Sequence, residues 1–354
     1  VSVTEIKTTT GSDTLKALST VHLRGEIQDE SGALIDGFNG ILEFTLFDKE
    51  VDFVTIGKNN PAFKYNEWYN ALYRGKASVV NGQFDFEFVL TKNIAHQVGQ
   101  GKLSLYASDP EDKIDASGAS LDFKIGGTEP DVQADVTAPA VRIFMGDTTF
   151  VSGGIVNTNS TLIVNLSDAS GINISGYGIG NSLVAYLDNG SEPLILNDYY
   201  EAYMDDFTKG TVRFPMRGLE PGRHSLTVKA WDTHNNPGQA TIEFIVSDGE
   251  NLVIETLGNF PNPFQSETSI FFTHNRSGDD LHAMLTIYSA NGMQLKTYEF
   301  EIPVSSYHVD LGEINDLYDF GKKLPAGLYL ARLAVRSLTN GSKSERVTKL
   351  IVVN

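Results

Sequence analysis

The chain has 354 residues, a formal net charge of -18 at pH 7, a pI near 4.7 and no cysteine. This length favours two or three domains, each large enough to bury its own core. The acidity argues against nucleic acid or an anionic lipid surface as a partner, and the lack of cysteine excludes a disulfide framework, a thiolate nucleophile and a zinc–cysteine site.

The dominant periodicity along the chain is two, which is typical of half-buried strands. In the segment QFDFEFV, the aromatic residues Phe84, Phe86 and Phe88 alternate with polar residues. Asn-Gly pairs favour tight hairpin turns because both residues tolerate positive φ, and such pairs occur at Asn81-Gly82, Asn189-Gly190, Asn291-Gly292 and Asn340-Gly341. No long amphipathic helix is apparent. The expected fold class is all-β, with three tandem antiparallel β-sandwich (Ig-like) modules.

Two linkers divide the expected modules. Residues 126–139, GGTEPDVQADVTAP, are rich in Gly, Pro, Asp and Thr and end in an Ala-Pro pair that disfavours helix. The second break, over residues 248–260, is less clearly marked by composition. The expected modules are an N-terminal β-sandwich over 1–128, an Ig-like β-sandwich over 138–248 and a third β-sandwich over 252–354.

Charge is distributed unevenly among these modules. From Leu252 to Asn354 there are 9 Lys and Arg against 11 Asp and Glu, so most of the acidity lies in the first two modules. The segment from Lys322 to the chain end contains seven basic residues and only Glu345 as an acid. Lysines on an exposed edge strand discourage sheet-to-sheet pairing, so this basic hairpin has a plain structural interpretation as well as a functional one.

No catalytic constellation is recognisable. The histidines do not form a His-Glu-x-x-His pair, and there is neither a Gly-x-Ser-x-Gly elbow nor a Walker phosphate loop. We therefore expect no catalytic residue and no cofactor. The first residues show no basic-then-apolar signal peptide, so we expect either that a signal has been removed or that the chain is an internal fragment.

Metal binding has weak candidates only. Hard oxygen donors of the kind that calcium takes from β-sandwich loops occur in two short segments, and the candidates are Asp168, Asp232, Asn235 and Asn236. Asx residues also cap turns through their own side chains, which needs no metal, and this interpretation is favoured.

Aromatic residues gather in two segments that we expect to be loops. They are Trp68, Tyr69 and Tyr73, and then Tyr199, Tyr200 and Tyr203. On the surface such rings can stack against sugars. Turned inward they are core or domain contacts, which is the favoured interpretation.

Four motifs follow one another in the third module. They are Asn262, Pro263 and Phe264; Ile287, Tyr288 and Gly292; Pro325, Gly327 and Tyr329; and Lys349, Leu350, Ile351 and Val352. Their order resembles the C-terminal sorting domain of type IX secretion cargo in Bacteroidetes. The resemblance implies that the last strands are a signal read by the secretion machinery, and strand addition or docking would be a physically reasonable means of recognition.

The first two modules are similar to the region that follows the peptidase domain in gingipain-like cysteine-peptidase sortases of type IX secretion. The segments that carry this resemblance include HLRGEIQDESGALIDGFNG, DASGINISGYGIGNS and LEPGRHSLTVKAWDTHNNPGQ. The family's catalytic Cys and His belong to an upstream domain. The resemblance thus implies a non-catalytic region that displays and anchors the peptidase, which in the family removes sorting domains from cargo.

The resemblance also implies a partner and a location. The expected partner is an outer-membrane protein of type IX secretion, a PorV-like barrel, with other attachment-complex proteins possible. The chain itself is expected at the cell surface after export through the periplasm, outer-membrane associated but not inserted. The candidate partner-binding residues are Pro325, Gly327, Tyr329, Arg346, Lys349, Leu350, Ile351 and Val352. The alternative is a stand-alone secreted adhesin or glycan-binding module that carries the same sorting domain.

Overall fold

The protein is all-β, as the alternation predicts. The computed structural model describes residues 1–354 except 58–60, 112, 177–179, 248, 250, 315–317, 320–321 and 354, and except the side chains of 318–319 and 322–323. In this described part the single helical element is the short 3₁₀ turn η1 (Asn197–Tyr199), and no helix is long and apolar enough to span a membrane.

Two compact units make up the chain. The first unit comprises Val1–Ile143, Val164–Arg213 and Thr227–Thr241, and the second comprises Phe144–Ile163, Phe214–Leu226 and Ile242–Asn354. The expected boundaries of three modules remain a prediction, and two of their end points, residues 248 and 354, lie outside the described residues.

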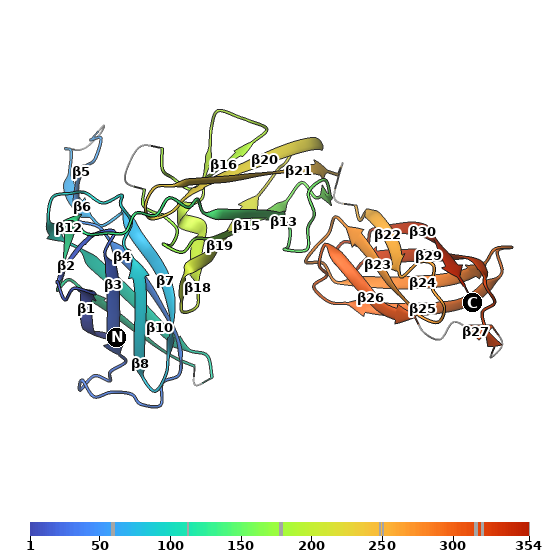
Figure 1. Ribbon diagram of the computed structural model, residues 1–354, viewed down its shortest axis with the longest axis horizontal. Coiled ribbons are helices and arrows are strands. Elements are labelled where there is room, and N and C mark those ends of the chain that lie inside the picture. Colours follow the sequence, from blue (N-terminus) through green and yellow to red (C-terminus); the bar gives the residue numbers. More distant parts are fainter. Residues whose placement is uncertain are drawn as a thin grey trace. The chain divides into compact units, whose positions relative to one another are not determined.

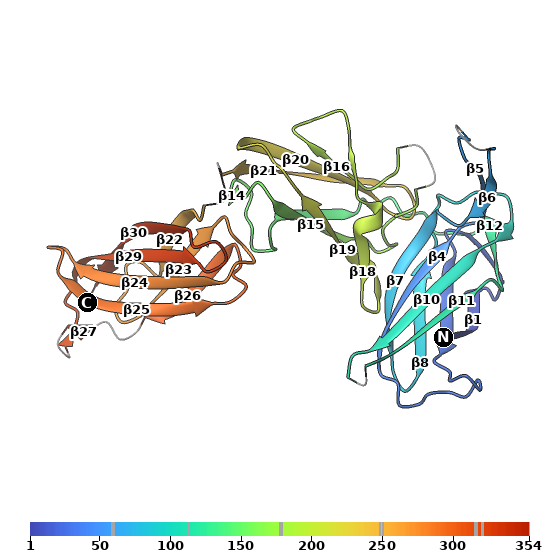
Figure 2. The same ribbon diagram turned by 180° about the vertical axis from the view of Figure 1, so that it is seen from behind.

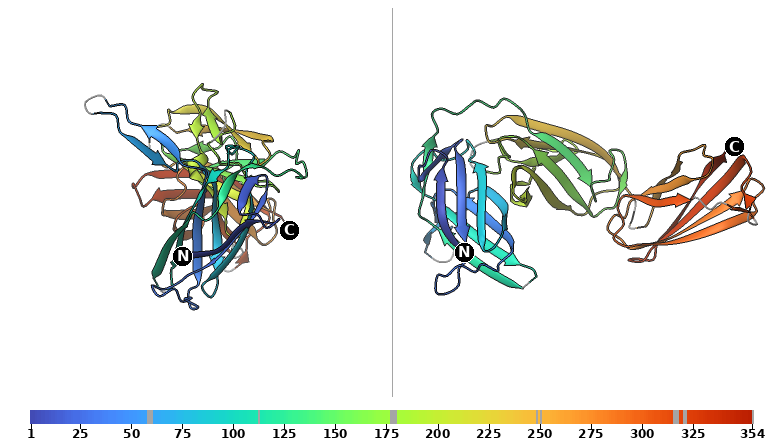
Figure 3. Two further views of the ribbon diagram at one scale, coloured as in Figure 1. Left: turned by 90° about the vertical axis from the view of Figure 1, so that its left-hand side faces the viewer. Right: turned by 60° about the horizontal axis from the view of Figure 1, so that its bottom comes forward.

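Residues 1–128 form four small sheets with the orders β1-β3-β8, β11-β10-β4-β7, β2-β12-β9 and β5-β6 (Figure 1). Their strands are β1 (Ser2–Thr8), β2 (Thr14–Ala17), β3 (Thr20–Glu26), β4 (Gly40–Phe47), β5 (Val51–Val54), β6 (Lys64–Glu67), β7 (Ala71–Val79), β8 (Gln83–Val89), β9 (Gly99–Gln100), β10 (Lys102–Asp109), β11 (Ile114–Ser120) and β12 (Lys124–Thr128). The hairpin of β5 and β6 projects from the other strands of this part (Figure 3).

Aromatic rings fill the core between the first two of these sheets. The predicted alternation in β8 is confirmed, because Phe84, Phe86 and Phe88 are buried while the residues between them face solvent. The Phe86 ring meets Phe44 of β4 edge-on at 5.2 Å between centroids, and Phe88 stacks on Tyr73 of β7 at 4.3 Å. Such pairs add to the stabilisation that burial of the rings already provides.

The middle of the chain forms two sheets with the orders β13-β15-β19-β18 and β14-β21-β20-β16-β17. Their strands are β13 (Ala140–Met145), β14 (Ile155–Val156), β15 (Ser160–Ser167), β16 (Val184–Leu187), β17 (Leu194–Ile195), β18 (Tyr200–Tyr203), β19 (Asp206–Met216), β20 (Gly222–Trp231) and β21 (Pro237–Val246). The sequence of β20 alternates in the same way, which predicts that Leu226, Val228 and Ala230 share one face, and all three are fully buried.

The third part of the chain is a two-sheet sandwich with the orders β22-β23-β26 and β25-β24-β29-β30 (Figure 2). Its strands are β22 (Ile254–Phe260), β23 (Thr268–His274), β24 (Leu281–Ser289), β25 (Gln294–Ile302), β26 (His308–Ile314), β29 (Gly327–Ser337) and β30 (Lys343–Val352), with the separate pair β27 (Tyr318–Asp319) and β28 (Lys322–Lys323). One apolar cluster joins both sheets, with Ile270 and Phe272 on one side and Leu285, Leu333 and Leu350 on the other.

The Asn-Gly turns match the prediction in one case of four. Asn81 and Gly82 both have positive φ, at 52° and 73°. In the hairpin of β16 and β17 the two positive-φ residues are Asp188 and Asn189, one position earlier than expected. At the pairs 291–292 and 340–341 only the glycine has positive φ. The prediction of two positive-φ residues is wrong there, because a turn with one left-handed residue needs only the glycine.

The last strand offers a direct test of the sandwich. Leu350 is fully buried and Ile351 is 40% exposed, although the two are neighbours. We expect Leu350→Ala to lower the free energy of unfolding by about 2–5 kcal/mol, because it leaves a cavity in the core. Ile351→Ala should change it by about 0.5 kcal/mol or less. Urea unfolding of both variants measures this, and equal costs would show that the strand is not packed in this register.

Candidate interaction surface at the chain end

The predicted recognition hairpin consists of β29 and β30. They pair antiparallel from Gly327 opposite Val352 to Arg336 opposite Lys343. The strand β30 lies at the edge of its sheet. An edge strand presents unpaired backbone groups, which can pair with another chain unless the protein covers them.

Residues 262–264 cover the end of this edge. The side-chain Nδ2 of Asn262 donates to the Lys349 carbonyl at 3.0 Å, and its Oδ1 accepts from the Ile351 backbone N–H at 3.0 Å. The Phe264 N–H donates to the Ile351 carbonyl, and the Val353 N–H donates to the Phe264 carbonyl. The first motif of the module therefore pairs with the last one and occupies the outer edge of β30 near the chain end.

The beginning of β30 is covered by the segment that leads into β22. The backbone N–H groups of Leu252 and Ile254 donate to the hydroxyls of Ser342 and Ser344. The Arg346 Nη1 donates to the Ile254 carbonyl at 2.9 Å. These side chains hold the segment 252–254 beside the first half of β30.

The sheet's outer face carries the exposed apolar side chains of the hairpin. Residues that pair across antiparallel strands lie on the same face. The pairs Leu328–Ile351 and Arg332–Val347 therefore share one face with Lys349. Exposed fractions are 44% for Leu328, 55% for Val347 and 40% for Ile351.

Other predicted partner-binding residues lie on the inner face or in the turn. Tyr329, Leu350 and Val352 are buried in the core. Gly327 pairs with Val352, and the Tyr329 hydroxyl donates to the Pro325 carbonyl at 2.9 Å, which closes the turn before β29. Their placement gives these residues a packing role in the sandwich, and of the eight candidates Lys349 and Ile351 face solvent on the outer sheet surface.

Two arginines of the basic hairpin already have partners within the third part of the chain. Arg332 contacts Glu345 with its Nη2 at 2.6 Å from the carboxylate. Arg346 is exposed but its guanidinium bonds to the Ile254 carbonyl, so a charge reversal there would remove a structural hydrogen bond. Lys349 therefore provides a cleaner test of a surface charge than Arg346.

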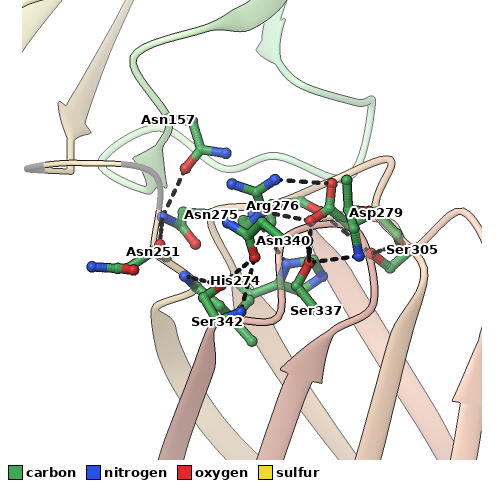
Figure 4. A network of polar contacts seen from close by, with 12 residues as sticks. Asn157, Asn251, His274, Asn275, Arg276, Asp279, Ser305, Ser337, Asn340 and Ser342 are labelled. Carbon is green, nitrogen blue, oxygen red and sulfur yellow. Dashed lines mark hydrogen bonds and ion pairs between the residues drawn. The ribbon is translucent and has the colours of Figure 1, made fainter.

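A polar network lies near the start of the third part of the chain, within the second unit (Figure 4). The Asn275 Nδ2 donates to the Asn157 side chain and to the Asn251 carbonyl, at 2.9 and 3.0 Å, while its Oδ1 accepts from the Val253 N–H. Arg276 is paired with Asp279. These groups hold together the loops around residues 157, 251–253 and 276–279, which is a structural role.

Within the second unit, Tyr307 contacts the segment that follows β13. Its N–H donates to Asp147, its hydroxyl donates to the Glu255 carboxylate, and its ring lies 5.1 Å from that of Phe150. The Tyr307 hydroxyl also lies 2.4 Å from the position that a Cβ on Gly154 would take, so a side chain at position 154 would collide with it.

The four weak metal candidates lie in the first unit, and in the described part of the chain Asp232 alone of the four belongs to a group of carboxylate and imidazole side chains placed to share one ion. Asp168 accepts from the backbone and hydroxyl of Ser170, and burial together with the charges of Asp232 and Asp135 raises its pKa. Asn235 donates to the Asn93 side chain at 2.8 Å. Asn236 donates to Asp232, so this part has the turn chemistry that the sequence favours.

Two residues near this turn were not predicted from the sequence. Asp135 and His234 each place a ligand atom within 4.8 Å of the other's and of one from Asp232. Asp135 comes from the segment expected to be a linker, 101 residues before Asn236, to which its carbonyl is hydrogen-bonded. A single sequence carries no signal for such a contact.

The aromatic clusters divide between core and surface. Tyr73 and Tyr200 are buried, whereas Tyr69, Tyr199 and Tyr203 are exposed. Trp68 and Tyr69 line a cavity of about 460 Å³ with the segment 97–100. The Lys102 amino group lies over the Trp68 ring, 5.0 Å from its centre.

No protein-family model and no curated protein matches this chain. Among solved structures, it is similar to dimeric latent PorU from Porphyromonas gingivalis, with 28% sequence identity and a TM-score of 0.44 over 99% of this chain and 33% of PorU. The chain thus spans about a third of the length of PorU.

Two further similarities are to tandem modules. One is to fibronectin(III)-like modules of CbhA from Clostridium thermocellum, with 9% identity, 60% of this chain and 94% of that chain covered, and a TM-score of 0.23. The other is to the FN1–FN3 domains of chicken CNTN1, with 12% identity, 100% and 97% covered, and a TM-score of 0.22.

The Asn262 clamp can be tested by two substitutions. Asn262→Ala removes both hydrogen bonds to β30, each worth about 0.5–1.5 kcal/mol, and should speed hydrogen exchange at the Ile351 amide. Asn262→Asp keeps an acceptor for that amide but cannot donate to Lys349. Exchange measured by NMR should therefore be faster in the Ala variant than in the Asp variant, and unchanged exchange in both would show that the clamp is not formed.

His274 makes the second unit sensitive to acid. Burial lowers the pKa of His274 to about 4, from an ordinary value of 6.5. The unfolded chain therefore takes up a proton as pH falls below about 6.5, whereas the folded chain does so only near pH 4. Stability that is present above pH 6.5 is lost over this window, by about 2–3 kcal/mol at pH 4.5.

The measurement is denaturant unfolding at pH 7.5 and 4.5. The free energy of unfolding should differ less between pH 7.5 and pH 4.5 in His274→Gln than in wild type, by about 2–3 kcal/mol. His282→Gln, at a partly exposed position, should show the wild-type difference. An equal pH difference in wild type and His274→Gln would contradict the assignment.

Proposed function

We propose that this chain is the non-catalytic display and anchoring region of a type IX secretion sortase, and that residues 252–354 dock to an outer-membrane barrel of the PorV type. The parent protein would be a gingipain-like cysteine peptidase that removes sorting domains from cargo, and the chain would act at the cell surface. The order of four motifs in the third part of the chain supports this proposal.

The structural roles of the motifs agree with the proposal. The segment 262–264 covers the outer edge of β30 near its end, and Gly292 lies in the turn between β24 and β25. The Tyr329 hydroxyl, at the start of β29, bonds to the Pro325 carbonyl in the turn before that strand. A domain built in this way presents its last hairpin as a fixed surface. Recognition then proceeds through side chains of that surface.

The observation that carries the proposal is the apolar strip on the outer face of the hairpin, formed by Leu328, Val347 and Ile351 beside Lys349. Exposed aliphatic side chains beside Lys349 and the Arg332–Glu345 ion pair are suited to a partner surface that excludes water at its centre and is polar at its rim. A strand added to the edge of β30 would have to displace the segment 262–264, so docking on the face is favoured.

A double substitution tests this surface. Val347→Glu with Ile351→Glu puts two carboxylates on the strip at exposed positions, where the cost to folding is about 0.5 kcal/mol each or less. We expect an unchanged melting temperature and at least about tenfold weaker binding to outer-membrane vesicles that contain the barrel, which corresponds to about 1.4 kcal/mol.

The matched control is Val304→Glu, at an exposed position in the loop between β25 and β26. It should bind like wild type, and vesicles without the barrel should bind neither protein. Wild-type binding by the folded double variant would place the contact elsewhere. Equal binding to vesicles with and without the barrel would refute the proposed partner.

A further inference from the structure

Three potential metal ligands converge in the first unit, outside the surface described above. One ligand atom each of Asp135, Asp232 and His234 lies within 4.8 Å of the other two. A tetrahedral zinc ion holds neighbouring ligand atoms about 3.4 Å apart, given bond lengths near 2.0–2.1 Å to nitrogen and oxygen. Small side-chain rotations are therefore sufficient to close this group onto an ion.

The local chain holds two of the three ligands in place. Asp232 follows β20 directly, is fully buried, and accepts hydrogen bonds from the Asn236 N–H and Nδ2 at 2.7 and 2.6 Å. The Asp135 carboxylate accepts from the Thr137 N–H. The Asn236 Nδ2 also donates to the Asp135 carbonyl at 2.9 Å. A carboxylate oxygen has a second lone pair, so these bonds leave acceptor capacity on both aspartates.

The charge of this group is not balanced by a neighbouring cation. In the described part of the chain, neither carboxylate forms an ion pair with Lys or Arg, and Asp168 adds a third carboxylate nearby. Asp232 is fully buried, and burying a carboxylate without a compensating charge is costly, a cost that a bound cation removes.

Within the part of the chain that the structure describes, the imidazole of His234 also lacks a partner at one ring nitrogen. Its Nε2 atom is buried and has no hydrogen-bond partner among the described residues. Buried ring nitrogens normally have a partner. A metal ion bound beside the two carboxylates would give this imidazole a ligand role that no protein group fulfils.

We propose that Asp135, Asp232 and His234 bind one zinc ion, with water as the fourth ligand, and that Asn236 orients the two aspartates. An imidazole with carboxylates is a donor set suited to zinc, whereas calcium takes oxygen ligands only. The ion joins the segment that precedes β13 to the turn between β20 and β21. Its role is structural, because it ties an otherwise irregular segment of the first unit to the sandwich.

The experiment uses the full chain, treated with a chelator and then dialysed. Isothermal titration with ZnCl₂ should show one site per chain, and zinc should raise the melting temperature. His234→Gln and Asp135→Asn should each weaken zinc binding at least about tenfold, since loss of a second-shell partner alone typically costs 10–100-fold. Both substitutions are at partly exposed positions, and each variant is first checked for a cooperative melt.

The control is His282→Gln, which removes a histidine in the second unit that lies near Glu301. It should bind zinc as wild type does. Zinc binding that is lost in this control but kept in His234→Gln would show an adventitious surface site and overturn the proposal. Absence of zinc binding by wild type would do the same, and would leave the turn stabilised by its asparagine alone.

A parallel titration with CaCl₂ separates the two donor chemistries. We expect no saturable heat with calcium. Calcium binding that is unaffected by His234→Gln, without zinc binding, would assign the site to oxygen ligands and exclude the imidazole from it.

Discussion

An edge strand leaves a row of backbone groups unpaired, and in β30 residues 262–264 form hydrogen bonds with these groups near the end of the strand. Asn262 bonds through one side chain to both Lys349 and Ile351, and Phe264 continues the pairing with backbone groups while its ring enters the core. The last strand is thereby held from both sides. Without this closure Leu350 and Val352 would sit on a strand supported by β29 alone.

For the proposed docking, this closure favours the face of the sheet over its edge. Strand addition gives affinity through backbone hydrogen bonds, but it needs an open edge. Residues 262–264 occupy the end of the β30 edge, and the side chains of Ser342, Ser344 and Arg346 bond to the backbone of Leu252 and Ile254. The outer sheet face remains, with Val347 and Ile351 exposed beside Lys349. Recognition by side chains also allows selectivity among related hairpins, since backbone bonds are the same in all of them.

Much of the fold follows from local sequence. The alternation in β8 and β20 predicts both strands and their buried faces, because the period of two is a property of the backbone itself. Turn details are less predictable. At 188–189 the chain uses Asp and Asn where Asn and Gly were expected, because hairpin register depends on the pairing of the strands on each side.

The candidate sites were harder to predict, for a physical reason. The terminal motif mixes residues that pack inward, such as Leu350, with residues that face solvent, such as Ile351, and only the sheet's position in the sandwich decides which is which. Asp135 meets Asp232 because a segment without regular structure returns to a distant turn. Contacts of this kind depend on tertiary folding and have no local periodicity.

Asparagine side chains recur wherever such segments meet. Asn262 bridges two residues of β30, Asn275 bridges the loops around 157 and 251–253, and Asn236 bridges Asp135 and Asp232. An amide donates and accepts at once, so one side chain can satisfy a carbonyl and an N–H where a sheet ladder cannot continue. It is also neutral. In a chain with a net charge of -18, aspartate at these positions would add repulsion and could not donate, which makes the amide the better bridge.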